Sequence, residues 1–253
     1  MTRHGSLHRR WALGLLASGV LFASAASTDD SPTIIEIGRF SGSHPGSPQT
    51  DGWKPLTFKK IPKPTEYELV LEDGAVVVKA TSDAAASGLT KAVNINPAVF
   101  PIVHWRWKVQ NLLTHSDVTR KSGDDYPARL YITFEYDPAK VSFGKKLKYK
   151  AGRALFGDIP IAALNYIWDT KTAVGMIVDN AFTDFAKMIV VESGEVKVGQ
   201  WVHESRNVYE DYKQAFGEDP PMINGVAIMT DTDNTKERAI AYYGDIRFSQ
   251  SPR

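Results

Sequence analysis

The sequence of 253 residues contains no cysteine. This absence excludes a disulfide framework, thiolate metal sites and a cysteine nucleophile. Net charge is also nearly absent, because 30 Lys and Arg residues face 29 Asp and Glu residues. A chain so balanced is not a nucleic-acid binder by its overall electrostatics, and we expect no partner of that kind. No residue class is extreme, which excludes collagen, a coiled coil and a disordered tail.

Long apolar runs are lacking as well, apart from residues 11–22. This run follows three arginines and precedes small residues that end at Ala25, the arrangement of an export signal and its cleavage site. It is too short for a membrane span, which needs roughly 20 apolar residues. We predict a signal peptide over residues 1–25, one β-sandwich domain over 26–253, no transmembrane segment after cleavage, and a periplasmic or secreted location. General secretion and twin-arginine export both stay open as routes.

Alternation of apolar and polar residues with period two dominates the rest of the chain. It predicts strands over residues 34–40, 66–71, 75–80, 88–95, 102–109, 129–136, 163–168, 175–179, 185–192, 200–207, 225–230 and 239–248. Helical periodicity is confined to residues 145–156 and 208–216. So many strands with so few helices predict a mainly β fold, an antiparallel β-sandwich or jelly roll with one or two short helices.

Basic and acidic side chains gather around two of these strands. Alternation over residues 102–109 places Arg106 on the face opposite the tryptophans. Asp124, Asp125 and Arg129 lie at the start of the strand that runs to Glu135. If the two strands pair, one face can carry Arg106, Arg129, Glu135 and either Asp124 or Asp125. The cluster then either orients a loop through bidentate hydrogen bonds or grips the hydroxyls or carboxylate of a ligand, and both interpretations stay open.

Aromatic rings beside planar polar side chains form a second theme. Tyr166 and Trp168 neighbour an asparagine and an aspartate, and Tyr243 lies two residues before Asp245. Proteins bind sugars by stacking an aromatic ring against the C–H face of the sugar and by hydrogen-bonding its hydroxyls with planar polar side chains. The same rings also build β-sandwich cores. The polar neighbours lead us to expect Tyr166, Trp168 and Tyr243 at exposed strand ends that line a cleft.

Glu204, Arg206 and Asp211 complete the predicted ligand-binding set. Glu204 and Arg206 share a strand face, so they can pair with each other or with Asp211 across the next turn. An enzyme would use two carboxylates, such as Asp125 with Glu204 or Asp211, as acid and base on a glycosidic bond or uronate. That chemistry needs a defined separation of the two groups, so no catalytic residue is assigned.

Oxygen-bearing side chains alternate at Asp231, Asp233 and Asn234, as they do in calcium loops. Asp245 would be a further ligand if the following strands return beside this loop. The pattern is not an EF-hand, because Lys236 stands where that motif has glycine. The other interpretation is a turn whose Asp and Asn side chains cap their own backbone. Calcium is the one cofactor that the sequence suggests.

Residues 140–157 contain six basic residues and no acid. Such a segment is a solvated helix face, or a surface that contacts anionic envelope glycan or lipid head groups.

Several short motifs occur in a distinctive order along the chain. They are Ser87-Gly88-Leu89, Trp105-Arg106-Trp107, residues 123–129, residues 165–168, residues 204–207, Asp211-Tyr212, residues 229–235 and residues 243–246. In these motifs the chain resembles the bacterial secreted family called domain of unknown function 3047, over about residues 40–248. The resemblance implies an exported domain with jelly-roll architecture. The family has no assigned activity, so the resemblance supplies no catalytic residues.

The sequence thus predicts an exported domain that binds a glycan, or a similar polyhydroxylated envelope ligand, without covalent chemistry. The alternatives are a glycan-active hydrolase or lyase that uses Asp, Glu and Arg, and a structural envelope protein with no small ligand.

Overall fold

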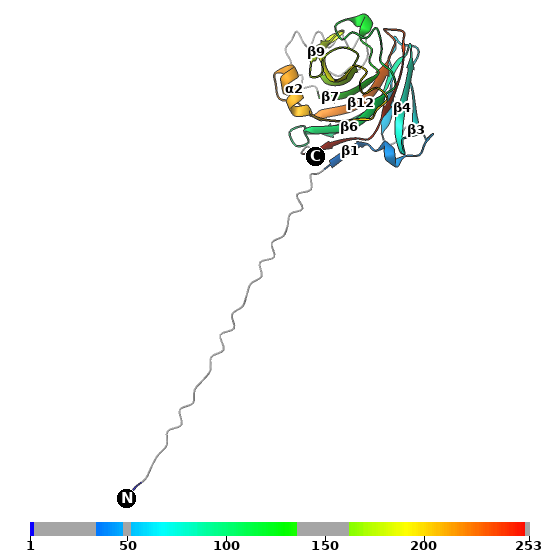
Figure 1. Cartoon of the computed structure of the whole chain (residues 1–253). Helices are drawn as coiled ribbons and strands as arrows, with labels where there is room; N and C mark the ends of the chain where they lie inside the picture. The colour runs from blue at the N-terminus through cyan, green and yellow to red at the C-terminus, as the bar shows by residue number, and fades with distance from the viewer. Residues whose placement is uncertain (3–33, 48–51, 136–161, 251–253) are drawn as a thin grey trace. The chain divides into compact units, whose positions relative to one another are not determined.

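The computed structural model describes residues 1–2, 34–47, 52–135 and 162–250 (Figure 1). The described strands and helices all belong to one compact unit, Pro32–Arg253. The predicted helix over residues 145–156 and the basic segment 140–157 lie outside the described residues. In the described part of the chain, no helix is long and apolar enough to cross a membrane.

Seven strands form the first sheet, called sheet A. Their order is β1 (Ile34–Gly38), β14 (Ile246–Ser249), β6 (Ile102–Val109), β13 (Arg238–Tyr243), β4 (Ala75–Asp83) and β3 (Glu66–Glu72), with β11 (Val202–Asn207) on the other edge of β6. All of these pairs are antiparallel. The single strand predicted over residues 239–248 is interrupted at Gly244, so that its two parts, β13 and β14, pair in turn with β6.

Seven further strands form sheet B. Their order is β2 (Trp53–Leu56), β5 (Ala86–Ile95), β12 (Ile223–Asp231), β7 (Ala128–Phe134), β8 (Ala163–Asp169), β10 (Thr183–Ser193) and β9 (Ile177–Asn180). The β8–β10 pair is parallel and the others are antiparallel. The predicted mainly β, antiparallel sandwich is confirmed.

One α-helix occurs among the described residues, α2 (Val208–Phe216), at the range predicted from the sequence. The side chain of Asn207 accepts the backbone N–H of Glu210, and Gly217 ends the helix with a positive φ of 76°. These caps explain the sharp limits of the helix. Figure 1 shows α2 on the side of the molecule that carries β9, away from β3 and β4. Two short 3-10 turns, η1 (Phe40–Gly42) and η2 (Lys121–Gly123), complete the fold.

The core between the sheets is rich in aromatic rings. Trp105 and Trp107 of sheet A face Tyr166 and Trp168 of sheet B, with ring centroids 5.3 Å and 6.2 Å apart. Tyr166, Trp168 and Tyr243 are 0%, 0% and 1% exposed, so the expectation that they line a cleft is wrong. The polar neighbours Asn165 and Asp169 point to the opposite face of the sheet from the rings of Tyr166 and Trp168, and they are buried as well. Polar neighbours in the sequence therefore do not show that a strand end is exposed.

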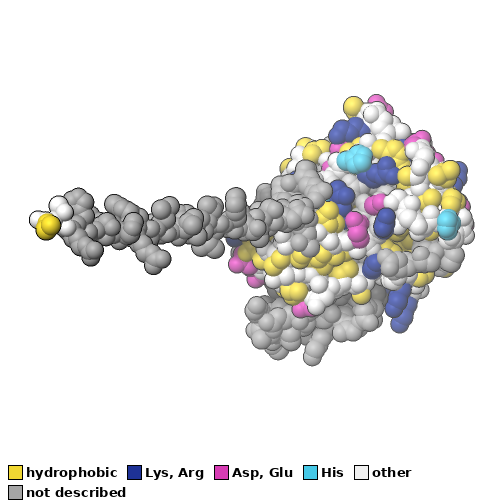
Figure 2. Space-filling model, turned by 90° about the horizontal axis from the view of Figure 1, so that it is seen from below, with side chains coloured by type: hydrophobic (Ala, Val, Ile, Leu, Met, Phe, Trp, Pro, Cys, Tyr) yellow, Lys and Arg dark blue, Asp and Glu magenta, His cyan; other side chains and the backbone are white. Residues whose placement is uncertain are grey.

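The pairing of residues 102–109 with residues 129–136, on which a shared face for Arg106 and Arg129 depended, does not occur. Strand β6 lies in sheet A and is already paired on both edges, whereas β7 lies in sheet B between β12 and β8. Arg106 therefore shares no face with Arg129. In the view of Figure 2, basic, acidic and apolar side chains are interspersed over the described surface, as the balanced composition suggests.

Candidate functional site

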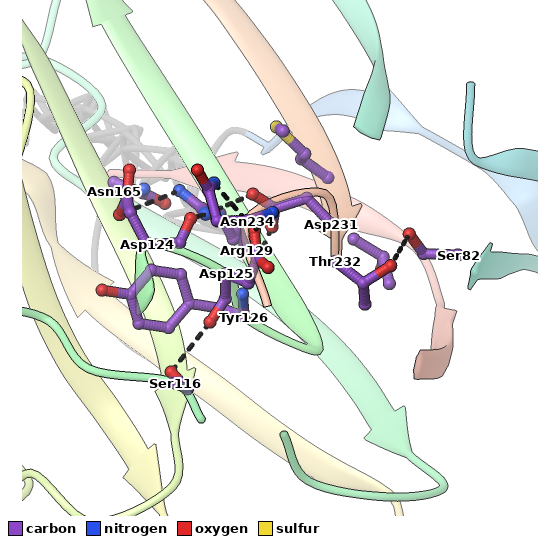
Figure 3. A network of polar contacts seen from close by, with 12 residues as sticks. Ser82, Ser116, Asp124, Asp125, Tyr126, Arg129, Asn165, Asp231, Thr232 and Asn234 are labelled. Atoms are coloured by element: carbon purple, nitrogen blue, oxygen red, sulfur yellow. Dashed lines mark hydrogen bonds and ion pairs between the residues drawn. The ribbon is translucent and has the colours of Figure 1, made fainter. Parts of the chain in front are cut away.

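Arg129 lies at the centre of a buried polar network on the outer face of sheet B (Figure 3). Its Nε donates to Asp231 Oδ1 at 2.8 Å, and its Nη2 bonds to the other oxygen of Asp231 and to the Asp124 carbonyl. Its guanidinium carbon lies 4.4 Å from the centroid of the Tyr126 ring. Burial is the largest single effect on Arg129 and opposes its charge, but the interactions with Asp231, Tyr131 and Asp124 together outweigh it and raise the arginine pKa. The network ties the loop before β7 to the end of β12.

Asp125 is fully buried and caps the turn that follows β12. Its Oδ1 accepts the backbone and side-chain N–H groups of Asn234 at 3.2 Å and 3.0 Å, and its Oδ2 accepts the Thr235 N–H. The turn interpretation is therefore right in kind, but the cap comes from Asp125 and not from the turn's own side chains. Asp124, Asp125 and Arg129 lie together, and all three are buried, at 7%, 0% and 2% exposed.

Asp125, Asp231 and Asp233 offer carboxylate oxygens that lie within 4.8 Å of one another. Asp245 is not in this group, because its carboxylate accepts the backbone N–H and the hydroxyl of Ser41. The expectation that Asp245 joins the loop is wrong, since the bulge at Gly244 directs it toward η1. Asn234 donates its amide to Asp125. Burial, and then the charge of Asp125, raise the pKa of Asp233.

Calcium binding by Asp231 and Asp233 stays a prediction from the sequence. If it holds, calcium should raise the melting temperature of the protein relative to EDTA, because a ligand of the native state stabilises it by mass action. Asp233→Asn, which alters the half-buried carboxylate and leaves Arg129 paired, should remove that difference. Identical melting curves in calcium and in EDTA would contradict the prediction.

Arg206 pairs with Asp211, which is one of the two arrangements that the sequence left open. Arg206 Nε donates to Asp211 Oδ2 at 3.0 Å, and the Tyr166 hydroxyl donates to the same oxygen at 2.8 Å. These bonds join β11, α2 and β8 at one edge of the sandwich. Trp168 donates its indole N–H to the Gly194 carbonyl at 3.3 Å. Tyr166, Trp168, Arg206 and Asp211 are thus occupied with one another and with the backbone.

Glu204 lies on the same edge and points between the sheets, opposite Trp105 in the register of β11 and β6. Its Oε1 is buried and has no hydrogen-bond partner. Burial, and then the negative charge of Glu192, raise the pKa of Glu204 to about 7. The Trp107 indole lowers this pKa slightly but does not reach hydrogen-bond geometry. Glu192 forms an ion pair with Lys197 at 2.5 Å. The charge of Lys197 also lowers the pKa of Glu204, so the same lysine acts on both carboxylates.

Arg106 lies elsewhere, on the outer face of sheet A. Its guanidinium carbon is 4.6 Å from the centroid of the Trp201 ring, and Lys108 Nζ is 5.2 Å from the same ring. The Trp201 indole N–H donates to Asp73 Oδ2 at 3.0 Å, and Lys108 bonds to that oxygen at 2.7 Å. Tyr242 packs beside them, with its ring centroid 6.4 Å from that of Trp201. We call Trp201, Arg106, Lys108, Asp73 and Tyr242 the Trp201 platform.

Gly244 makes room for Arg106 in this platform. The strand bulges here, and the Gly244 N–H donates to the Arg106 carbonyl at 2.9 Å. A Cβ atom at position 244 would lie 2.5 Å from Cγ and Nε of Arg106, which is closer than real Cβ contacts come. Gly244 therefore leaves the space that the Arg106 side chain occupies, and a larger residue at position 244 would require the arginine to move.

The sequence singled out Arg106 as a ligand-binding candidate, in a cluster with Arg129, but it did not single out Trp201 or Asp73. The two are 128 residues apart, and only the pairing of β11 with β6 and the β3–β4 hairpin bring them together. The Asp73-Gly74 step between the predicted strands 66–71 and 75–80 is typical of a hairpin turn, and it was the available signal. It places Asp73 at a sheet end, although it does not say which ring lies there.

The family described as protein of unknown function DUF3047 matches residues 51–247 of the chain. The chain belongs to this family. The resemblance seen in the motifs is thereby confirmed, and the sandwich described above is the fold of a DUF3047 member. No curated protein matches the chain.

Three solved structures are similar to this DUF3047 chain. The family 11 carbohydrate-binding module of a cellulosomal cellulase of Clostridium thermocellum has 8% identity and a TM-score of 0.42, covering 86% of this chain and 94% of its own. The xylan-binding module CBM15 has 8% identity and a TM-score of 0.33, covering 87% and 97%. The glycoside hydrolase domain of Endo-D from Streptococcus pneumoniae R6 has 11% identity and a TM-score of 0.32, covering 79% and 22%.

Proposed function

We propose that this DUF3047 protein binds a glycan, or a similar polyhydroxylated ligand, non-covalently at the Trp201 platform, and that it does so outside the cytoplasm as its export signal predicts. The observation that carries the proposal is a half-buried tryptophan ring held at both its face and its edge by charged side chains on an open sheet face.

The ring is fixed in orientation before any ligand arrives. Arg106 and Lys108 both project from the outer face of β6, so they cover the side of Trp201 that faces the sheet. The bond from the indole to Asp73 prevents rotation of the ring. The remaining exposed side can therefore stack on the C–H face of a sugar. A preformed ring loses little conformational entropy on binding, which favours affinity.

Polar groups at the rim supply hydrogen bonds for sugar hydroxyls. The Asp73 side chain is 62% exposed, and its hydrogen bonds to Lys108 and then to Trp201 lower its pKa. It therefore remains an ionised acceptor. Arg106 contributes N–H donors on the other side of the ring. The Trp201 ring thus has the donor groups of Arg106 and the acceptor carboxylate of Asp73 beside it, and this combination suits a ligand with several hydroxyls.

The test is isothermal titration of the chain with a panel of neutral and acidic oligosaccharides. We expect Trp201→Ala to weaken the bound member of the panel at least tenfold, because ring stacking and the orientation of Arg106 are lost together. Phe182→Ala is the matched control, since Phe182 is also an exposed aromatic residue, 45% accessible, but lies on the β9–β10 turn.

Three outcomes would overturn parts of the proposal. Full binding by Trp201→Ala would move the site away from the platform. A panel without any bound saccharide would reject glycan recognition. Release of new reducing ends over time would replace binding by hydrolysis, with Glu204 and Glu192 as the carboxylates to test first, because Glu204 is a buried carboxyl of raised pKa and the charge of Glu192 contributes to that rise.

A further inference from the structure

Two arginines on the outer face of sheet A have unused hydrogen-bond donors. Within the described ranges, the side chains of Arg106 and Arg247 make no hydrogen bond and no ion pair. Both side chains are half-buried. Guanidinium groups held close to a protein surface normally meet carboxylates, because each offers five donors in a planar fork. Two such groups without a counter-ion on one sheet face therefore need an explanation.

The sheet register brings the two arginines close together. Arg247 of β14 lies opposite His104 of β6, and Arg106 is two residues further along β6 on the same face. Diagonal neighbours of this kind lie within reach of long side chains. His203 of β11 lies directly opposite Arg106 and is exposed. The basic groups therefore form one patch that adjoins Trp201.

Within the described residues, the acids near this patch make no hydrogen bond or ion pair to Arg106 or Arg247, although the charge of Arg106 contributes to the lowered pKa of Asp73. Glu72 and Asp73 both bind Lys108, at 2.5 Å and 2.7 Å. Glu36 is the cross-strand partner of Arg247 in the register, yet no ion pair joins their side chains in the described part of the chain. Like charges side by side on a sheet are destabilising unless an anion lies between them.

We infer that the ligand of the Trp201 platform carries a carboxylate, so that the glycan class it recognises is acidic, with uronic acid units. This inference rests on the proposed function and names its substrate class. The sugar ring stacks on Trp201, its carboxylate accepts two N–H groups of Arg106 in a bidentate pair, and Arg247 supplies the neighbouring positive charge. Arg106 lies against the sheet-facing side of Trp201, 4.6 Å from the ring centroid, so a carboxylate that extends past the edge of the ring meets the fork while the same sugar unit stacks on the exposed side.

The experiment compares one saccharide in two charge states. Isothermal titration of the full chain uses an oligogalacturonide and its fully methyl-esterified form, which has the same backbone without the negative charges. We expect the acid to bind at least tenfold more tightly than the ester in 50 mM salt, and the advantage to shrink in 500 mM salt because exposed charges are screened.

Variants locate the origin of this preference. Arg106→Gln should bring the acid to the affinity of the ester, and Arg106→Lys should retain only part of the preference because a point charge replaces the fork. Arg247→Gln should reduce it as well. Lys79→Gln is the matched control, since Lys79 lies on the same face but is paired with Glu68 at 2.8 Å, and it should leave the preference unchanged. Melting temperatures confirm that each variant is folded.

The outcomes separate this inference from the function on which it rests. Equal binding of acid and ester, lost in Trp201→Ala, overturns the acidic class and keeps the glycan platform. A preference that survives in the Arg106→Gln/Arg247→Gln double variant also overturns it, because the charge that is recognised then lies elsewhere. Failure of acid, ester and neutral panel alike rejects the platform itself.

Discussion

Replacing Arg129 with methionine should lower the free energy of unfolding by about 3–5 kcal/mol, the cost of removing one partner from a buried ion pair. Methionine fills a similar volume, so the loss arises from charge and not from a cavity. Asp231, which is 2% exposed, would remain buried without its partner, and the Asp124 carbonyl would lose its donor. Urea denaturation of the parent and the variant measures the difference.

Two further variants make this expectation specific to the buried pair. Arg106→Met removes an arginine from the half-buried outer face of sheet A, where we expect a change of less than about 1 kcal/mol. Arg129→Met combined with Asp231→Leu removes both charges, and it should recover much of the lost stability. A single Arg129→Met variant as stable as Arg106→Met would show that the network contributes little to folding.

The mainly β fold follows from the sequence because its signal is local. Period-two alternation over six to ten residues is enough to specify a strand, and Asn207 and Gly217 mark the ends of α2 within the sequence itself. The pairing of Arg206 with Asp211 is equally local, since only one turn separates them. Such short-range features require no knowledge of which strands become neighbours.

The site could not be assembled in the same way, because its contacts join distant segments. Arg129 meets Asp231 across 102 residues, through strands that are neighbours only in the finished sheet. The sequence also did not show which rings are buried. Period two assigns the side chains of residues 163–169 to two faces of a strand, but in this sandwich both faces of that strand are buried. Polar neighbours therefore do not reveal which rings are exposed.

Glu204→Gln should stabilise the protein in alkaline solution and leave its stability nearly unchanged at acid pH. The carboxyl has a pKa of about 7 in the folded chain against an ordinary value of 4.5, chiefly because it is buried. Since the folded state holds this proton more tightly than the unfolded state does, the associated stability is fully present below pH 4.5. It is lost progressively as the pH rises to about 7.

Glutamine keeps the shape of the protonated acid at every pH, so it avoids the cost of a buried charge beside Glu192. Allowing for solvent screening of a half-buried side chain, we expect a gain of about 2 kcal/mol at pH 8. Urea denaturation at pH 4.5, 6 and 8 measures it, and Glu195→Gln on the adjoining loop, where the side chain is exposed, serves as the control. If both variants follow the parent at all three pH values, Glu204 ionises as freely as a surface residue, and its buried oxygen must have a partner in solution.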